Sequence, residues 1–393
     1  MLSLDGLAEF LTFGFTLDGR TMRKELSVPT LSVSSSDIEK NMDSGIEYVY
    51  VALKESMERL IQSDTGLSLS GGLDSRILAG IAAELEEEIP TFTWGYSKFE
   101  KIIAHKVASI LKLPHYAIDM DMRLNKETFE KLGHLVMETG GAINLANLYI
   151  RTYLSQHFKE HGIKTIISAA YFDEINGDLF ACKVSSTQKF CDVFVQTHAH
   201  PSLPHIYREI AKRNLSERCY NIPFSKLYPL IYVRNLCKDF EVRDWVKWTT
   251  PIIDRKVLSS IISLPYEQRI NKRIQKAILR KYFPKLYKVP YVMSGLAPFF
   301  PHPLHRCARK LMHFLFESTK QEKSRPLLTF DYQWFERINL PLLQDLLFSN
   351  LPPFMDLETM QNLVYRIQTN RSIRDGLFLD QLSTYALLAS QIN

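Results

Sequence analysis

Two adjacent glycines constrain this chain more than any other feature of its sequence. Gly71 and Gly72 stand between an apolar segment at residues 66–70 and an alanine- and leucine-rich segment at residues 75–88. The first segment is typical of a short buried strand and the second of a helix. Glycine lets the backbone approach a ligand closely and adopt conformations that other residues avoid. The sequence therefore predicts a strand-to-helix turn that leaves room for a bound group.

The residues around these glycines favour a phosphate ligand. A helix that begins at this turn would point its unpaired N–H groups and its positive dipole end at the bound group. Ser70 and Ser75 add hydroxyl donors for phosphate oxygens. Asp74 is a carboxylate in a site built for anions, which suits a Mg²⁺ ion that bridges to phosphates. An ordinary Gly-Gly turn with a capping serine is the alternative.

Strands and helices are expected to alternate over residues 66–170. Apolar or β-branched segments typical of strands occupy residues 66–70, 91–97, 114–120 and 164–170. Segments with the apolar period of helices lie between them, at residues 75–88, 100–112, 126–138 and 144–161. This alternation predicts an α/β fold with a doubly wound parallel sheet and helices on both faces.

The flanking regions have helical patterns. Residues 2–12 and 44–62 show helical periodicity, and beyond residue 205 the chain is helical and aromatic with no convincing strand. Residues 267–283 form the most basic of the expected helices. We therefore expect three parts: a helical lead-in at 1–62, a nucleotide-binding α/β core at 63–205, and a mainly helical part at 206–393.

The composition narrows the class of protein. Hydrophobic residues make up 46% of the 393 residues and charged residues 23%, as in ordinary globular proteins. The net charge of +5 is too small to argue for a nucleic-acid partner. The five cysteines lack metal-ligand spacing, and no apolar run reaches the roughly 18 residues of a membrane helix. Because the N-terminus does not resemble a signal peptide, we expect a soluble, cytoplasmic protein without a membrane partner.

The glycine turn also matches a known motif. The segment Ser70-Gly71-Gly72-Leu73-Asp74-Ser75 resembles the pyrophosphate-binding loop of the ATP-pyrophosphatase superfamily, whose enzymes split ATP between its α and β phosphates. The resemblance implies an adenine nucleotide alpha-hydrolase-like fold, with ATP and Mg²⁺ as cofactors. The nucleotide-binding residues that it implies are Leu69, Ser70, Gly71, Gly72, Asp74 and Ser75. Asp74 would also be a metal ligand.

Further segments are similar to the synthase domain of asparagine synthetases. Residues 93–96 look like the end of the family's second strand, which implies that Trp94 and Gly95 border the adenine pocket. Residues 166–177 resemble the family signature SG(D/E)GxDExxGG. The first carboxylate of its Asp-Glu pair, here Asp173, is implied to be the second Mg²⁺ ligand.

Basic residues beyond the signature also resemble a family pattern. Residues 264–280 are similar to LP…R…KxxLR, which would bring the basic helix near the nucleotide. A solvated helix face is the alternative. The family's lysine loop RxKxxF is absent, and residues 284–290 stand in its place. A lysine there would stabilise pyrophosphate as its charge develops, with Lys288 as the first candidate and Lys285 as the second.

Two positions bear on the acceptor half of the reaction. Ala170 stands where the family signature has an acidic residue, and alanine cannot take a proton from an attacking amine. Glu174 is the candidate for that role, with Asp173 and Asp178 nearby in sequence. Asn144, in the segment that corresponds to the family's acceptor pocket, is either a helix cap or a substrate contact.

The N-terminus departs from the family pattern as well. Leu2 stands where full-length family members carry a nucleophilic cysteine, and no cysteine precedes Cys182. We therefore expect this chain to lack its own glutaminase. Ammonia would then come from solution or from a separate glutaminase subunit, or a different amine would serve as nucleophile.

The resemblance implies that the protein is a carbon–nitrogen ligase. A small-molecule carboxylate, aspartate or a related one, would react with ATP to give an acyl-adenylate and pyrophosphate, and ammonia or an amine would then displace AMP. One alternative is a natural-product or peptide cyclase of the same family. The others are a non-catalytic family member that binds nucleotide, and a tRNA-modifying enzyme that shares the nucleotide loop.

Overall fold

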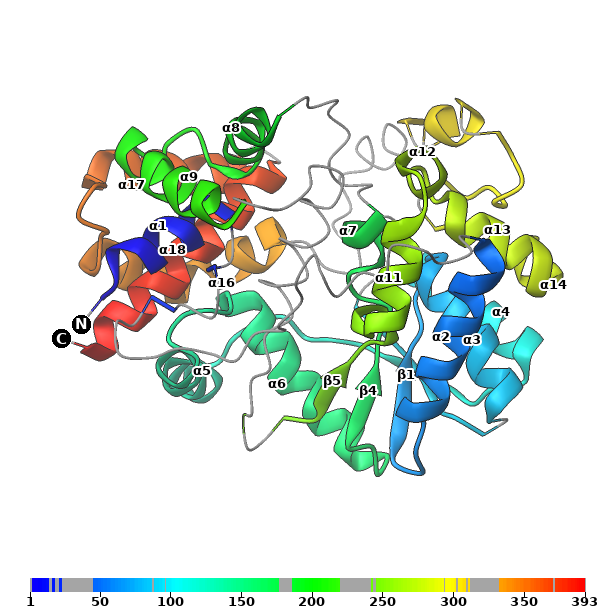
Figure 1. The fold of residues 1–393 in the computed structure, drawn as a ribbon. Coiled ribbons are helices and arrows are strands. Elements are labelled where there is room, and N and C mark those ends of the chain that lie inside the picture. The colour runs from blue at the N-terminus through cyan, green and yellow to red at the C-terminus, as the bar shows by residue number, and fades with distance from the viewer. Residues whose placement is uncertain are drawn as a thin grey trace.

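The chain folds into a sheet-containing lobe and a helical lobe (Figure 1). The structure, a computed structural model, describes residues 2–13, 16–17, 21–22, 45–86, 88–95, 97–176, 186–219, 242, 245–292, 294–301, 303–308, 310–311, 332–369 and 372–392. Both ends of the chain lie in the helical lobe (Figure 1). No helix within these ranges is long and apolar enough to cross a membrane.

A parallel sheet organises the first lobe. Its strands are β1 (Thr65–Ser68), β2 (Thr91–Trp94), β3 (His115–Ile118), β4 (Thr165–Ile167) and β5 (Lys247–Thr249). They are arranged in the order β3-β2-β1-β4-β5, and every neighbouring pair is parallel. The order runs in one direction from β1 to β3 and in the other from β1 to β5, which is the doubly wound arrangement that the sequence predicted.

Helices cover both faces of this sheet. One face packs against α2 (Ile46–Leu60), α3 (Asp74–Leu85), α4 (Lys98–Leu111), α11 (Arg255–Ser263) and α13 (Arg273–Tyr282). The other face packs against α5 (Lys126–Glu138) and α6 (Leu145–Glu160). The neighbouring residues Ile166 and Ile167 are both fully buried, one in each of these two cores. Burial on both faces explains why β4 has two successive isoleucines instead of alternating apolar and polar residues.

The helical lobe continues the core on the α5–α6 side. It contains α1 (Leu4–Phe13), α8 (Thr187–His198), α9 (His205–Cys219), α16 (Tyr332–Ser349), α17 (Leu357–Thr369) and α18 (Ile373–Ile392). The last helix, α18, packs against α16 in its own lobe and against α5 and α6 beside the sheet. Because α1 packs on both α9 and α18, the first and last helices share one apolar core.

Two expectations about the region beyond residue 205 are wrong. The chain returns there to add β5 to the edge of the sheet. This strand has only three residues, too few to show a strand period in the sequence. The boundaries between the three expected parts, at residues 62 and 205, stay a prediction. The sheet contains one strand, β5, from the third of these parts.

The basic segment 267–283 is not one helix. It is divided into α12 (Tyr266–Arg269) and α13, and α14 (Pro284–Tyr287) follows. Between α12 and α13, Asn271 and Lys272 have φ angles of 61° and 58°. These left-handed conformations cannot continue a right-handed helix, and asparagine tolerates them better than most residues. The break aims the start of α13 at the carboxyl edge of the sheet, where the candidate site lies.

Candidate active site

The candidate site lies where the strand order reverses. β1 leads into the glycine turn at residues 69–75, and its neighbour β4 leads into residues 168–173. Ligands of doubly wound folds bind at the carboxyl ends of the two strands that flank such a switch point. Asp74 and Asp173 follow these two strands, so the fold brings together carboxylates that are far apart in sequence.

The serines of the glycine turn hold each other in place. The Ser70 backbone N–H donates to the Ser75 hydroxyl oxygen over 3.0 Å, and the two hydroxyl oxygens are 2.8 Å apart. The Gly72 N–H donates to Ser70 Oγ over 3.1 Å. The buried residue before them, Leu69, accepts a hydrogen bond at its carbonyl from the Thr93 hydroxyl. The turn is thus organised by its own side chains at the N-terminus of α3.

Gly71 is needed for contact with the chain itself. A Cβ atom at this position would lie 2.8 Å from Cβ of Val292, which is too close for any real pair. The Val292 N–H donates to the Gly71 carbonyl over 3.2 Å, and the Gly71 N–H donates to Glu100 Oε1 over 3.3 Å. A Cβ at Gly72 would meet only Ser70 Oγ, at 3.1 Å. The open side of the turn is therefore at Gly72.

Arg76 ties the turn to residues 286–290, a role that the sequence analysis missed. Its guanidinium is fully buried and donates to the carbonyls of Leu286 (3.0 Å), Val289 (2.8 Å) and Pro290 (2.8 Å). It also reaches the Gly71 carbonyl at 3.3 Å. Burial lowers the pKa of Arg76 to about 10, so it remains charged at neutral pH. Its signal in the sequence is an arginine directly after the motif, in an otherwise apolar helix.

The centre of the site is an ion cluster of two acids and one lysine. Lys272 Nζ lies 2.8 Å from Asp74 Oδ2 and also contacts Asp173. The side-chain exposures are low, at 17% for Lys272, 19% for Asp74 and 33% for Asp173. Burial alone would lower the pKa of Lys272, but the two carboxylates outweigh it and raise that pKa well above its usual range. The lysine therefore stays protonated at neutral pH.

Gln275 completes the surroundings of Asp74. Its Nε2 donates to Asp74 Oδ1 over 2.8 Å, so both oxygens of this carboxylate accept a hydrogen bond. Gln275 Oε1 is buried and has no hydrogen-bond partner. Sequence analysis missed both Gln275 and Lys272. The sequence sign of the turn that places Lys272 is Asn271, because asparagine tolerates the left-handed conformation that ends a helix.

The donor atoms of this cluster fit a magnesium ion. Mg²⁺ prefers oxygen ligands and is commonly held by one or two carboxylates together with phosphate oxygens and water. Asp74 and Asp173 supply the carboxylates, and the orphaned Gln275 Oε1 is a further neutral oxygen. Within the described residues, no three His, Cys, Asp or Glu side chains form a complete metal site. The two acids therefore suit a metal that arrives with phosphate.

Tyr171 occupies a position where the family signature has glycine. Its φ of 73° is left-handed, a conformation that glycine adopts readily. The same conformation costs a tyrosine about 1 kcal/mol or more. Next to it, Ala170 is exposed, and its carbonyl accepts from the Thr250 hydroxyl over 3.3 Å. Glu174 lies in the short helix α7 (Phe172–Asn176), and its side chain lies outside the described part of the structure.

Trp94 ends β2 and Gly95 follows it, on the same edge of the sheet. The Trp94 ring packs edge-on against Trp248 and Phe158, with centroid distances of 5.5 Å and 6.1 Å. Gly95 has a φ of 101°, so a glycine is needed where the chain leaves the strand. Tyr96 lies outside the described residues. Contact of Trp94 and Gly95 with adenine stays a prediction.

Some basic residues of the segment 267–288 lie near the candidate site and others lie on the surface. Arg269 is buried and donates to the Ile175 carbonyl, whereas Lys281 is exposed and pairs with Glu47 at 2.9 Å. Lys285 and Lys288 are also exposed, at the two ends of the short helix α14. The lysine that the fold brings to the carboxylates is Lys272, and a role for Lys288 with pyrophosphate stays a prediction.

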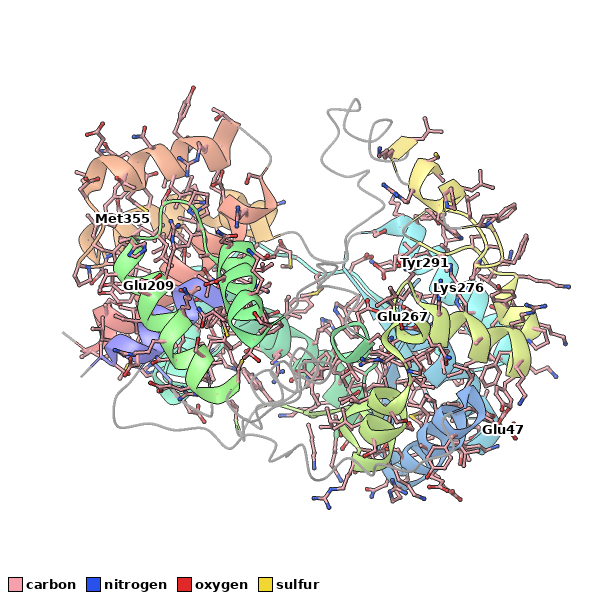
Figure 2. All side chains as sticks on the ribbon, turned by 45° about the horizontal axis from the view of Figure 1, so that its top comes forward. Glu47, Glu209, Glu267, Lys276, Tyr291 and Met355 are labelled. Carbon is pink, nitrogen blue, oxygen red and sulfur yellow. The ribbon has the colours of Figure 1, made fainter. Side chains whose placement is uncertain are left out.

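Figure 2 locates this region by its labelled side chains. Glu267, Lys276 and Tyr291 lie together in the sheet lobe, around the turn between α12 and α13, whereas Glu209 and Met355 lie in the helical lobe (Figure 2). The proximity of Tyr291 contributes to the raised pKa of Lys272.

Asn144 has a structural role. Its side chain caps the N-terminus of α6 by accepting from the Asn147 N–H over 3.3 Å. The same helix start receives Thr384 and Asp380 from α18, through the N–H groups of Leu145 and Ala146. Of the two alternatives for Asn144, the helix cap is therefore present.

Comparison with known proteins matches one part of the site, from the glycine turn to Asp173, to a protein family. The model of the family described as asparagine synthase matches residues 49–218. That range contains four of the five strands, the glycine turn and Asp173. No curated protein matches the chain.

Proposed function

We propose that the protein, whose residues 49–218 match the asparagine synthase family of ATP-dependent ligases, forms amide bonds with ATP as the energy source. A carboxylate substrate would attack the α-phosphorus of ATP, and an acyl-adenylate and pyrophosphate would result. Ammonia or an amine would then attack the acyl carbon and release AMP. The observation that carries this proposal is the convergence of Asp74 and Asp173 beside the glycine turn.

The glycine turn would bind the β and γ phosphates. α3 begins at Asp74, so the N–H groups of its first turn have no partner within the helix and attract anions. The hydroxyls of Ser70 and Ser75 lie next to them. Gly72 leaves the turn open on one side. Trp94 and Gly95, on the adjacent strand, would border the adenine.

The two carboxylates would hold Mg²⁺, which would neutralise phosphate charge. Asp74 and Asp173 supply the oxygen ligands that this ion prefers. Cationic side chains would stabilise the pyrophosphate as it leaves, since charge develops on it in the transition state. Lys272, at the cluster, and Lys288, directly after α14, are the candidates for that role.

The attacking amine must lose a proton, and this step separates the candidate functions. Ala170 is exposed where the family signature has an acidic residue and cannot accept the proton. Glu174 is the proposed base in its place. A small-molecule carboxylate such as aspartate is the first candidate substrate, with the amine supplied as ammonia from solution or from a glutaminase partner.

Ala170 also favours a second candidate function. Without the signature's acidic residue, the protein would bind nucleotide without forming an amide, or it would act on a different acceptor, as in a natural-product or peptide cyclase of the family. Both alternatives keep the same nucleotide site. One differs from the first proposal in forming no amide, and the other differs in its acceptor.

The decisive experiment is ATP–pyrophosphate exchange with Mg²⁺ over a panel of carboxylates headed by aspartate. The test variant is Asp74→Asn, and the matched control is Asp64→Asn, which changes an aspartate paired with Lys164 at the opposite end of the same strands. Exchange that depends on one carboxylate, falls about 100-fold or more in Asp74→Asn and persists in Asp64→Asn would support adenylation. ATP binding without exchange would favour the non-catalytic alternative, and absence of ATP binding would refute the proposal.

A further inference from the structure

Lys272 lies where a cation is required. Asp74 and Asp173 follow neighbouring strands, and two carboxylates repel each other unless a positive charge lies between them. The Lys272 ammonium supplies that charge, because it contacts both side chains and lies 2.8 Å from Asp74 Oδ2. The same position, between the two acids, is the one that a bridging divalent cation would take.

The hydrogen bonds around Asp74 leave little room for a metal while the lysine is present. One oxygen of the carboxylate accepts from Lys272 and the other accepts from Gln275 Nε2, both over 2.8 Å. A metal that binds this carboxylate must therefore displace a donor or share an oxygen with it. Lys272 is the donor whose removal is favoured, since its positive charge would repel the incoming ion.

The lysine is placed so that it can leave without unfolding its helix. Its backbone belongs to the left-handed turn before α13, and only its side chain reaches the acids. Four methylene groups give the ammonium a range of positions around a fixed backbone. When it leaves, Gln275 Oε1, which is buried and has no hydrogen-bond partner, remains beside Asp74 as an oxygen that a metal or its bound water would satisfy.

We infer that Lys272 is a built-in counter-ion that occupies the divalent-cation position between Asp74 and Asp173 in the nucleotide-free protein and competes with the metal for it. Free Mg²⁺ then binds weakly, and the metal enters well only together with phosphate, whose negative charge accepts the displaced ammonium. The inference rests on the proposed function only in taking ATP as the source of that phosphate. An ion pair that merely joins α13 to the sheet is the competing explanation.

The test measures metal binding rather than activity. Mn²⁺, a paramagnetic substitute for Mg²⁺, is titrated into nucleotide-free protein and followed by electron paramagnetic resonance. Lys272→Met should bind Mn²⁺ about tenfold more tightly than the wild type, because the competing charge is gone. The control is Lys164→Met, which removes an exposed lysine paired with Asp64 and should leave Mn²⁺ affinity unchanged.

Further variants guard against loss of folding. Lys272→Gln keeps a polar side chain and should also bind Mn²⁺ more tightly, whereas Lys272→Arg keeps the charge and should resemble the wild type. Mg²⁺ should raise the melting temperature of Lys272→Met more than that of the wild type. Equal or weaker Mn²⁺ affinity in both neutral variants, with circular dichroism showing a folded protein, would overturn the inference.

Failure of this inference can be distinguished from failure of the proposed function. If the wild type adenylates a carboxylate but the neutral variants gain no Mn²⁺ affinity, the lysine is structural and the function stands. If the neutral variants gain Mn²⁺ affinity but the wild type binds no ATP, the counter-ion role stands and the function fails.

Discussion

At the amino-terminal edge of the sheet, Asp64 precedes β1 and Lys164 precedes β4, and their side chains are 3.2 Å apart. At the carboxyl-terminal edge, Asp74 follows the same β1 and pairs with Lys272 at 2.8 Å. The chemical groups are the same, yet the Lys164 side chain is 82% exposed and the Lys272 side chain only 17%. An exposed pair is screened by water and salt, whereas a buried pair is screened much less.

Charge is distributed differently at the two edges as well. The amino edge has a half-buried titratable group at His115, the first residue of β3, where burial lowers the pKa to about 4 and keeps the ring neutral at pH 7. The carboxyl edge keeps Lys272 and Arg76 charged although both are largely buried. The amino edge thus carries an exposed ion pair, whereas the carboxyl edge is built around buried charges that both the fold and the candidate site use.

The largest effect should come from Arg76→Met at the carboxyl edge. The substitution leaves the carbonyls of Leu286, Val289 and Pro290 without their buried donor. We expect the free energy of unfolding to fall by about 3 kcal/mol or more, measured by urea denaturation. The control Arg59→Met removes an exposed arginine paired with Asp254 and should cost under about 1 kcal/mol. Similar losses in the two variants would remove the distinction between buried and exposed charges.

The next effect should be that of Lys272→Met. Asp74 and Asp173 then remain close without a cation, which should lower the free energy of unfolding by about 2 kcal/mol in metal-free buffer at pH 7. Because the pKa of Lys272 is raised in the folded state, its contribution is complete below the unfolded-state pKa of about 10.4 and is lost as the pH rises further. Urea denaturation of the variant and the wild type at pH 7, 9 and 11 measures this stability difference and its pH dependence. A difference that is larger at pH 11 than at pH 7 would contradict the prediction.

A smaller effect is expected at His115, and it depends on acid. Its folded-state pKa of about 4 lies below the unfolded value of about 6.5, so the unfolded chain binds more protons between these limits. Stability should therefore fall as the pH falls through this window, by about 1 kcal/mol from His115 after allowance for partial exposure. His115→Gln should lose less stability than the wild type between pH 7 and pH 4.5. The control His134→Gln, which replaces an exposed histidine on α5, should lose the same amount as the wild type.

The smallest effect should be that of Lys164→Met. Its exposed pair with Asp64 should contribute under about 0.5 kcal/mol, and even that difference should vanish in 1 M NaCl, where the screening length is about 3 Å. Urea denaturation of the variant and the wild type at low and high salt measures the difference. A loss comparable to that of Lys272→Met would mean that burial does not explain the contrast between the two edges.

Local patterns in the sequence were sufficient to predict most of the fold. The apolar and β-branched patterns placed β1 to β4 and the helices between them close to their observed positions, because most of these elements bury apolar residues at regular spacing. β5 was missed because three residues carry no period. The break in the basic helix depends on the left-handed conformation of Asn271 and Lys272, which no apolar period records.

The candidate site was predictable only where its residues are adjacent in sequence. The glycine turn forms its bonds within six residues, so its motif contains most of its geometry. Arg76, Lys272 and Gln275 take part through contacts across about 200 positions of the chain, which depend on tertiary structure. Charged residues near a motif are common on protein surfaces, so sequence alone did not separate Lys272 from Lys288.

The bonds of Arg76 have a consequence for how the protein is made. A ribosome completes β1, the glycine turn and α3 long before it reaches residues 286–290, which hold the carbonyls that this guanidinium requires. Until then Arg76 lacks three of the carbonyls that accept its hydrogen bonds, so we expect α3 to be packed less firmly than in the finished protein. A chain that ends at Tyr282 would retain the whole of the matched family domain and still stop short of a finished nucleotide loop.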